Sequence, residues 1–574
     1  MARDPSLIIR NGTVVDGTGA KPFEADVAIE DGKIVAVERR ISQRGAEEID
    51  AKGRMVAPGL VDIHTHYDGQ VTWSGEVTPS SQLGVTTVLM GNCGVGFAPV
   101  RKDDHGLLIK LMEGVEDIPE PVLSAGLPWN WESFGDYLDA LGARHYDADI
   151  ATQLPHAALR VYVMGERGVD REPATDADCA EMRRLSAEAM RQGALGFGTS
   201  RTINHRASDG RHIPTLTAEE SELTAIAMGM KDAGTGVMQI VSDLRDVEGE
   251  FAMLRRIMEK SGRPLSISLA QNDRAPDRWR QTLGLIERAS DDGLPVKAQV
   301  CGRAIGLMLG LELSRNPFFT HPTYRRIAHL PLKERVAELR KPEVRAAILS
   351  EQPMNHRDVL ERIANFERIF VLGDPPDYEQ APEQSLAGIA RRTGKRAEEI
   401  AYDVLLEREG SGMLYVPLLN YVSGNLDTTR EMLAHRDTLP GLGDGGAHVG
   451  IICDASTPTF LLTHWARDRK RGAKLPIETV ISRQARETAA AVGLNDRGVI
   501  AAGYKADINV IDFDRLTLRA PEVAYDLPTG GRRLMQRADG YVATIVSGAV
   551  VRREGADTGA RPGRLVRGAQ RAGA

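Results

Sequence analysis

The stretch MVAPGLVDIHTHYDG, residues 55–69, carries the strongest structural signal in this sequence. Its apolar run at residues 60–63 predicts a buried strand, and side chains two positions apart on a strand face the same way. His64 and His66 are therefore expected to converge at the carboxyl end of that strand, where barrel enzymes keep their active sites. A bare His-x-His pattern also occurs in loops and on surfaces, but the flanking Pro-Gly and Tyr-Asp pairs favour a divalent metal site.

The sequence on either side predicts two different kinds of structure. Residues 6–37 read as short strands joined by Asn-Gly and Asp-Gly turns, and strand-like segments return at residues 506–512 and 541–551. Between about residues 58 and 490, short apolar runs alternate with longer helical stretches, which predicts a parallel sheet with crossover helices. We therefore expect an α/β fold: a (β/α)8 TIM-like barrel plus a small β-sandwich formed by both chain ends.

These patterns also predict the domain boundaries. Residues 1–57 and 491–555 are expected to build the sandwich, and residues 58–490 the barrel. Residues 316–392 break the alternation and are rich in Arg, Glu and Pro, so we interpret them as an insertion over the barrel mouth. Residues 556–574 consist largely of Gly, Ala and Arg and are expected to form a flexible tail or an arm of a homo-oligomer.

Composition excludes several classes of function. The 574 residues include 72 Lys and Arg and 80 Asp and Glu, a net charge of −8 with both signs interspersed, so nucleic-acid binding is not expected. The chain begins without a signal-peptide core and contains no uncharged apolar run of about 18 residues, so no membrane span is expected. The four cysteines are too far apart for a disulfide framework, which favours a reducing, cytoplasmic location. They are Cys93, Cys179, Cys301 and Cys453.

Two segments resemble a known family. APGLVDIHTHYD at residues 57–68, with GVTTVLMGNCGVGFAP at 84–99, is similar to the D-aminoacylase (N-acyl-D-amino-acid deacylase) branch of the amidohydrolase superfamily. Further matching pieces include GLGDGGAH at 441–448, GVIAAGYKADINVIDFD at 498–514 and YDLPTGGRRLMQ at 525–536. The resemblance implies a metal-bearing barrel with a composite β-sandwich, which is the layout that the residue pattern predicts more vaguely.

The resemblance also implies two site residues. Cys93 in GNCG matches the metal-bridging cysteine of the family, and a thiolate is a sound zinc ligand. The alternative is a small buried apolar side chain, the usual role of a lone intracellular cysteine. Asp444 in GLGDGGAH matches the aspartate that ends the eighth strand, where a carboxylate can hold the metal and move a proton. Its alternative is an ordinary turn aspartate before glycine.

Two further metal histidines of the family are missing here. One position falls on Leu269, which cannot bind a metal. The other falls on Val241 or on Asp243, depending on which flanking residues anchor the count, and Asp243 is either a substitute oxygen ligand or a solvated loop residue. We therefore expect one zinc ion per chain, which is chemically sufficient to polarise a carbonyl and activate water. Its expected ligands are His64, His66, Cys93 and Asp444.

Substrate recognition departs from the family as well. The Lys and Tyr that grip the substrate carboxylate would fall in LAQND at 269–273 and KAQVCGRAIG at 297–306. These regions and their neighbours offer Gln271, Asn272, Arg274, Gln299 and Arg303. Arg303 is predicted to bind an anion, with a surface or helix-pairing arginine as the alternative. His448 is predicted to contact substrate or to orient a metal ligand.

The expected activity is hydrolysis of a linear amide C–N bond, with a small-molecule amide as partner. Zinc would activate water while Asp444 shuttles the proton, and the resemblance makes N-acyl-D-amino acids the leading substrate class. One alternative is a cyclic amide, imide or carbamate hydrolase on the same barrel. Another is a metal-poor, non-catalytic scaffold, because the two histidines are lost and a fold does not determine function.

Overall fold

The computed structural model describes residues 5–354 and 363–571. Within them, eight parallel strands follow one another around a barrel, and a parallel bridge between Thr65 and Gly445 joins the first strand to the last. β8 and β9 are consecutive pieces of one strand, separated by Gln153. The strands are β6 (Leu60–Asp62), β7 (Val85–Met90), β8 (Asp149–Thr152) with β9 (Leu154–Pro155), β10 (Gly196–Arg201), β11 (Val237–Ser242), β12 (Leu265–Ser268), β13 (Val296–Val300) and β17 (Thr438–Pro440).

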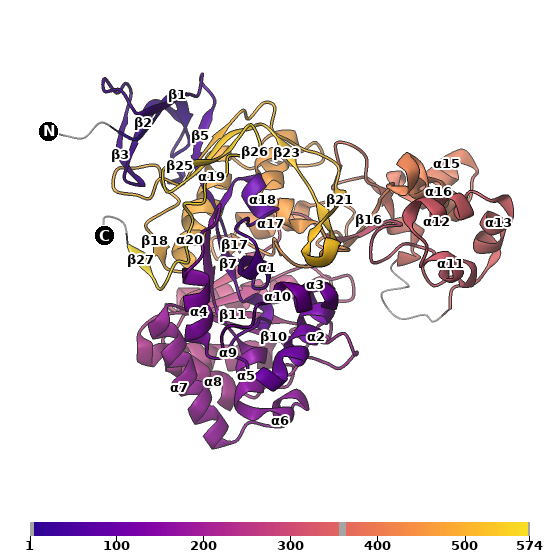
Figure 1. Cartoon of the computed structure of the whole chain (residues 1–574), viewed down its shortest axis with the longest axis horizontal. Coiled ribbons are helices and arrows are strands. Elements are labelled where there is room, and N and C mark those ends of the chain that lie inside the picture. The colour runs from indigo at the N-terminus through magenta and orange to yellow at the C-terminus, as the bar shows by residue number, and fades with distance from the viewer. Residues whose placement is uncertain (1–4, 355–362, 572–574) are drawn as a thin grey trace.

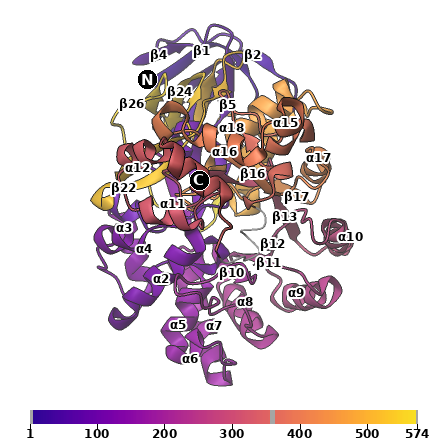
Figure 2. The same cartoon turned by 90° about the vertical axis from the view of Figure 1, so that its right-hand side faces the viewer.

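Crossover helices cover the outside of these strands (Figure 1). Their ends follow local chemistry: Thr175 and Asp178 form a reciprocal cap at the start of α7, and left-handed glycines end α8 and α9. Seen from the side, α8, α9 and α10 follow the strand order around the barrel (Figure 2). The helices are α7 (Asp176–Gln192), α8 (Glu220–Ala233), α9 (Val247–Ser261), α10 (Arg278–Asp291) and α17 (Asp427–Ala434).

Shorter helices occupy the long connections near the barrel mouth and after its last strand. α2 runs between β7 and β8, and its C-terminal residue reaches the site described below. The helices before α7 are α1 (Gln70–Trp73), α2 (His105–Glu116), α3 (Glu120–Gly126), α4 (Phe134–Gly142), α5 (His156–Met164) and α6 (Glu166–Val169). Those after β17 are α18 (Thr457–Phe460), α19 (Ile477–Ser482) and α20 (Thr488–Ala491).

Both chain ends contribute to one nine-stranded sheet, as predicted (Figure 1). The two halves join where β19 pairs antiparallel with β5, with Ile508 opposite Pro58 and Ile511 opposite Met55. The N-terminal strands are β1 (Leu7–Val14), β2 (Phe23–Glu30), β3 (Lys33–Glu38), β4 (Glu47–Asp50) and β5 (Met55–Pro58). The C-terminal strands are β19 (Ile508–Ile511), β24 (Tyr541–Val546), β25 (Ala549–Arg553) and β26 (Ala556–Asp557).

The insertion is more extensive than residues 316–392, of which 355–362 lie outside the described part of the chain. It is built on an antiparallel sheet of β14 (Ile305–Leu309), β16 (Leu414–Leu419) and β15 (Phe370–Val371). In sequence, the apolar runs of β14 and β16 look like barrel strands. Only their antiparallel pairing distinguishes them from the parallel strands of the barrel. Its helices project to one side (Figure 1) and are α11 (Pro322–Ile327), α12 (Leu332–Leu339), α13 (Pro342–Ser350), α15 (Leu386–Thr393) and α16 (Ala397–Leu405).

The C-terminal segment up to Arg571 differs from the flexible tail expected for residues 556–574, of which 572–574 lie outside the described part of the chain. Its backbone pairs with the barrel, where Tyr146 N–H donates to Gly563 at 3.0 Å and Val566 N–H donates to Ile150 at 2.8 Å. β27 (Gln570–Arg571) then pairs with β18 (Leu494–Asn495). The physical reason is that the side chain of Val566 is buried in an apolar cluster with barrel residues. Among residues 5–354 and 363–571, we find no helix with the length and apolar character needed to cross a bilayer.

Candidate metal centre

Three residues with metal-binding side chains meet at the carboxyl end of the barrel. His64 and His66 follow β6, and Cys93 follows β7, so parallel neighbouring strands deliver them to one edge. All three are buried, and their ligand atoms lie within 4.8 Å of one another. Cys93 Sγ lies 3.4 Å from His64 Nε2. The convergence predicted from the His-x-His spacing is therefore present.

Asp444 completes the cluster from the end of the last strand. Its Oδ1 lies 3.5 Å from His64 Nε2 and 3.6 Å from His66 Nε2. Two backbone hydrogen bonds hold the loop against the first strand: Asp444 N–H donates to His64 at 3.0 Å, and His66 N–H donates to Gly445 at 2.7 Å. Asp444 and Cys93 have φ values of 48° and 56°, a left-handed conformation that costs of order 1–3 kcal/mol and is concentrated at functional sites.

A different side chain lies beside Nδ1 of each histidine. His64 Nδ1 is 2.6 Å from Gln299 Oε1, and the amide of Gln299 is oriented in turn because its Nε2 donates to Ser266 Oγ at 2.8 Å. His66 Nδ1 is 3.3 Å from Glu116 Oε1. Both rings therefore turn Nε2 toward Asp444, the orientation in which outer residues commonly hold metal-binding histidines.

Burial and charge shift the titration of these groups. Burial lowers the pKa of His64 to about 4 and raises the pKa of the Cys93 thiol to about 11. Burial opposes the charged form of Asp444, but the close contact with His66 and the nearby imidazoles of His64 and His448 outweigh it and hold the pKa of Asp444 well below its usual range. Burial also raises the pKa values of Asp62 and Asp68 to about 7.

These residues fit a bound metal ion. Asp444 Oδ1 and both carboxylate oxygens of Glu116 are buried without a hydrogen-bond partner among the described residues. Buried charge without compensation is costly, and a cation bound among these groups would supply that compensation. Two imidazole nitrogens, a thiolate sulfur and a carboxylate oxygen form a donor set that suits zinc. A metal ion would also favour deprotonation of the buried Cys93 thiol.

The positions of the missing family histidines lie outside this cluster. Leu269 is buried among apolar side chains. Asp243 is used by the neighbouring loop, since its Oδ1 accepts from Thr202 Oγ1 at 2.6 Å and its Oδ2 accepts from Ile203 N–H at 3.1 Å. Asp243 was expected to be either a substitute metal ligand or a loop residue. These contacts correspond to a loop residue, whose carboxylate is bound to the segment after β10.

The predicted substrate residues occupy different surroundings. Arg303 is fully buried, donates to Asp454, Ser456 and the Cys453 carbonyl, and lies over the ring of Tyr378. His448 follows the Asp444 loop, and its Nε2 is 3.4 Å from Glu116 Oε2. A role for either residue in binding substrate stays a prediction.

Sequence analysis missed the two residues that hold the histidines. Glu116 is the last residue of α2, a helix that no motif marked, and nothing in its local sequence signals a site. Gln299 was noted only as a replacement for a substrate-binding residue, whereas its side chain contacts His64. His205, in the loop after β10, is half-buried with Nδ1 2.9 Å from Ser200 Oγ, and burial lowers its pKa to about 3.

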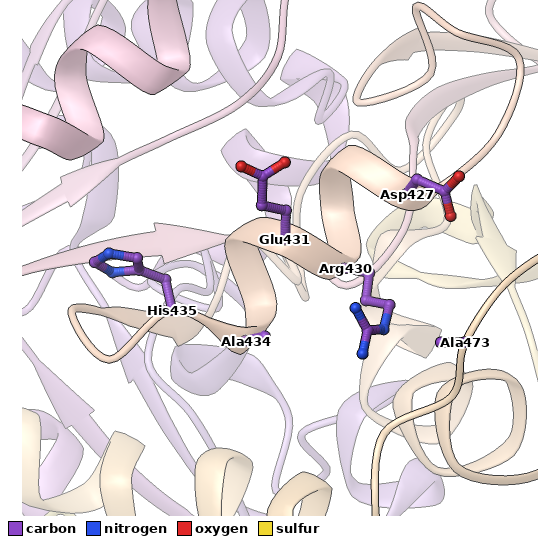
Figure 3. A pocket seen from close by; sticks show the side chains of 6 residues that line it. All are labelled: Asp427, Arg430, Glu431, Ala434, His435 and Ala473. Atoms are coloured by element: carbon purple, nitrogen blue, oxygen red, sulfur yellow. The ribbon is translucent and has the colours of Figure 1, made fainter.

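A separate surface pocket lies on α17 (Figure 3). It is lined by Asp427, Arg430, Glu431, Ala434, His435 and Ala473. The labelled side chains of α17 and of His435 spread outward rather than toward one another, and Ala473 lies on a separate segment. His435 precedes β17, whereas Asp444 follows this strand, so the pocket lies toward the opposite end of the strand from the candidate metal site.

Fold and site together define a class of protein: a (β/α)8 barrel with a terminal β-sandwich and a His, Cys and Asp cluster at the barrel mouth. The chain belongs to the Amidohydrolase family, because the sequence model of that family matches residues 47–552. The family resemblance and the fold class that were expected from the sequence are thereby confirmed.

The similarity to individual relatives extends over nearly the whole chain. A D-aminoacylase of Alcaligenes xylosoxydans xylosoxydans is 28% identical, covering 98% of this chain and 97% of its own length. A D-aminoacylase structure, described by its binuclear metal centre, superimposes with a TM-score of 0.65 at 24% identity over 98% of this chain and 100% of that one. An N-acyl-D-glutamate deacylase from Bordetella bronchiseptica, solved with zinc and a phosphonate inhibitor, gives 0.64 at 21% identity, with the same coverage. Both structural matches support the fold.

Proposed function

We propose that this protein is a zinc-dependent amidohydrolase that cleaves the linear amide bond of an N-acyl-D-amino acid or a related N-acyl compound. One observation carries the proposal: two imidazoles, a thiol and a carboxylate converge at the catalytic end of the barrel. Support for the substrate class comes from the D-aminoacylase that is 28% identical over 98% of this chain.

One zinc ion per chain is proposed, with His64, His66, Cys93 and Asp444 as its ligands. Support for a single ion comes from the two positions where family histidines are absent. Leu269 has no donor atom, and both carboxylate oxygens of Asp243 accept hydrogen bonds from the loop at residues 202–203. These residues leave no second set of ligands comparable with the first in the described part of the chain.

The proposed chemistry assigns the proton transfers to Asp444. A zinc ion held by His64, His66, Cys93 and Asp444 would supply a Lewis acid, which would polarise the amide carbonyl and lower the pKa of water toward about 7. Asp444, held as a carboxylate by its low pKa, accepts the proton that the attacking water loses as the new C–O bond forms. It returns that proton to the amide nitrogen as the C–N bond breaks, so that the products are a carboxylic acid and an amine, and proton exchange between them gives the carboxylate and the ammonium ion.

Metal content per chain is the first test, measured by elemental mass spectrometry on protein purified without added metal or chelator. About one zinc per chain supports the proposal. About two would contradict the single-ion site, and a value near zero that added zinc does not restore would favour the non-catalytic alternative.

A substrate panel then tests the reaction. It compares N-acyl-D-amino acids, their L-enantiomers, and cyclic amides, imides and carbamates. Selective release of the D-amino acid supports the proposal, whereas turnover confined to the cyclic compounds or carbamates would replace it with the alternative hydrolase. The same panel run on apoprotein is the control for metal dependence.

A further inference from the structure

The C-terminal residue of α2 places a buried carboxylate between two histidines. Glu116 is 1% exposed. Its Oε1 lies 3.3 Å from Nδ1 of His66, and its Oε2 lies 3.4 Å from Nε2 of His448. Neither oxygen has a hydrogen-bond partner of good geometry among the described residues, and the same holds for Nδ1 of His66, so the two imidazole contacts are close charge contacts at these distances. Because a buried carboxylate is costly unless polar neighbours compensate it, these two imidazole contacts need a physical explanation.

Backbone and side-chain contacts hold this end of α2 in place. The carbonyl of Glu116 accepts a hydrogen bond from the backbone of His448. The next residue, Asp117, accepts at Oδ2 from Gly450 N–H at 3.2 Å and from Ser314 Oγ at 2.8 Å. The loop after the eighth strand is thus tied to the end of α2 at Glu116 and at Asp117, so the carboxylate has a defined position relative to His66.

The two metal-site histidines are held by chemically different partners. His64 meets the neutral amide of Gln299, whereas His66 meets the carboxylate of Glu116. A carboxylate that accepts the Nδ1 proton of an imidazole fixes the tautomer that presents the Nε2 lone pair, and it also raises the basicity of that nitrogen. His66 Nε2 is the atom that faces Asp444 Oδ1 at 3.6 Å.

We infer that Glu116 is a positioning residue: its carboxylate accepts the Nδ1 proton of His66 and holds Nε2 of that ring toward the proposed metal. This inference rests on the proposed function, because it assumes that the cluster binds a metal ion. It adds a residue from the connection between the second and third barrel strands to the machinery, one that contacts the histidine and does not itself touch substrate. Its other oxygen faces His448, so the same carboxylate links the metal-binding histidine to the loop that carries Asp444.

The test compares Glu116→Gln and Glu116→Leu with Glu113→Gln. Glu113 lies one turn earlier on α2, and its carboxylate accepts from Glu120 N–H at 3.2 Å, away from the histidines. Full-length apoproteins are titrated with zinc against a chromophoric chelator. Outer residues of this kind typically contribute about 10–100-fold in metal affinity. We expect affinity to fall about 10-fold for Glu116→Gln, to fall further for Glu116→Leu, and to stay unchanged for Glu113→Gln.

A second readout separates positioning from general destabilisation. The absorption spectrum of the cobalt-substituted protein should change in Glu116→Gln and match wild type in Glu113→Gln, while thermal unfolding of the Glu116→Gln and wild-type apoproteins remains similar. Equal zinc affinities and identical cobalt spectra for wild type and both Glu116 variants would overturn the inference. A wild-type protein that binds neither zinc nor cobalt would instead overturn the proposed function, on which the inference depends.

Discussion

Gln299 holds His64 from the side of the ring opposite the proposed metal, with its Oε1 2.6 Å from Nδ1 of the imidazole. Because the amide nitrogen of Gln299 donates to Ser266, the amide oxygen faces the ring and accepts a hydrogen bond from Nδ1–H of His64. The lone pair of His64 then lies on Nε2, which faces Cys93 and Asp444. A neutral glutamine from the seventh barrel strand therefore selects the tautomer of a histidine from the first.

Replacing Gln299 with Leu should weaken zinc binding and lower activity. Without the acceptor, His64 can rotate or carry its proton on Nε2, and loss of such an outer contact typically costs about 10–100-fold. Chelator competition measures the affinity, and Gln281→Leu, an exposed position on α10, serves as the control. Unchanged affinity in Gln299→Leu would show that the hydrogen bond does not orient the ring.

Asp444→Asn should lower kcat on the N-acyl substrate by about 10²–10⁴-fold, the usual contribution of a positioned acid or base. The asparagine cannot accept the proton that the attacking water loses. Steady-state kinetics and metal content are measured together, since the same side chain is a proposed ligand. Asp243→Asn is the matched comparison and should retain its zinc, because both oxygens of that carboxylate are used by the loop at residues 202–203. Full turnover by Asp444→Asn would rule out the proposed proton shuttle.

Cys93→Ser should remove the spectroscopic signature of a thiolate ligand. In cobalt-substituted wild type, coordination by sulfur predicts an intense near-ultraviolet charge-transfer band, which an oxygen ligand does not supply. Cys179→Ser provides the control, because Cys179 lies on α7, away from the cluster. A band that persists in Cys93→Ser and disappears in Cys179→Ser would show that the thiolate ligand is Cys179 and not Cys93.

Asp149→Asn should destabilise the contact between barrel and sandwich. Asp149 Oδ2 is 2.7 Å from Arg497 Nη1 and 3.0 Å from Lys505 Nζ. Burial disfavours the Asp149 carboxylate, but these two cations outweigh it and lower its pKa. Removing one partner of a buried ion pair typically costs about 3–5 kcal/mol in the free energy of unfolding. Exposed Asp277→Asn is the control.

The pH dependence of that loss has a definite sign. Because the folded pKa of Asp149 lies below the unfolded value of about 3.9, its stabilisation is complete above that value and declines as the pH falls through the folded pKa. Thermal unfolding should therefore separate wild type from Asp149→Asn clearly at pH 7 and progressively less below about pH 4. A difference that grows on acidification would contradict this assignment.

The barrel and the convergence of His64 and His66, two of the proposed ligands, could be predicted because their signals are local. Alternating short apolar runs and helical stretches favoured the parallel barrel, and the spacing of His64 and His66 placed them on one face of a strand. The insertion was harder to delimit, since β14 and β16 have the apolar runs of barrel strands and only pairing shows that they are antiparallel. The C-terminal segment was misjudged because the short apolar sequence around Val566 was enough to anchor it.

By itself, the sequence determined the residue types at the strand ends and, through resemblance, the expected roles of Cys93 and Asp444. Tertiary structure alone decided which distant side chains contact the two histidines of the site. Gln299 is 235 residues from His64 along the chain, and Glu116 belongs to a helix that carries no motif. Such contacts depend on closure of the barrel and on the path of its connections. These bring together residues that are distant in sequence, and the local sequence around either residue does not predict the contact.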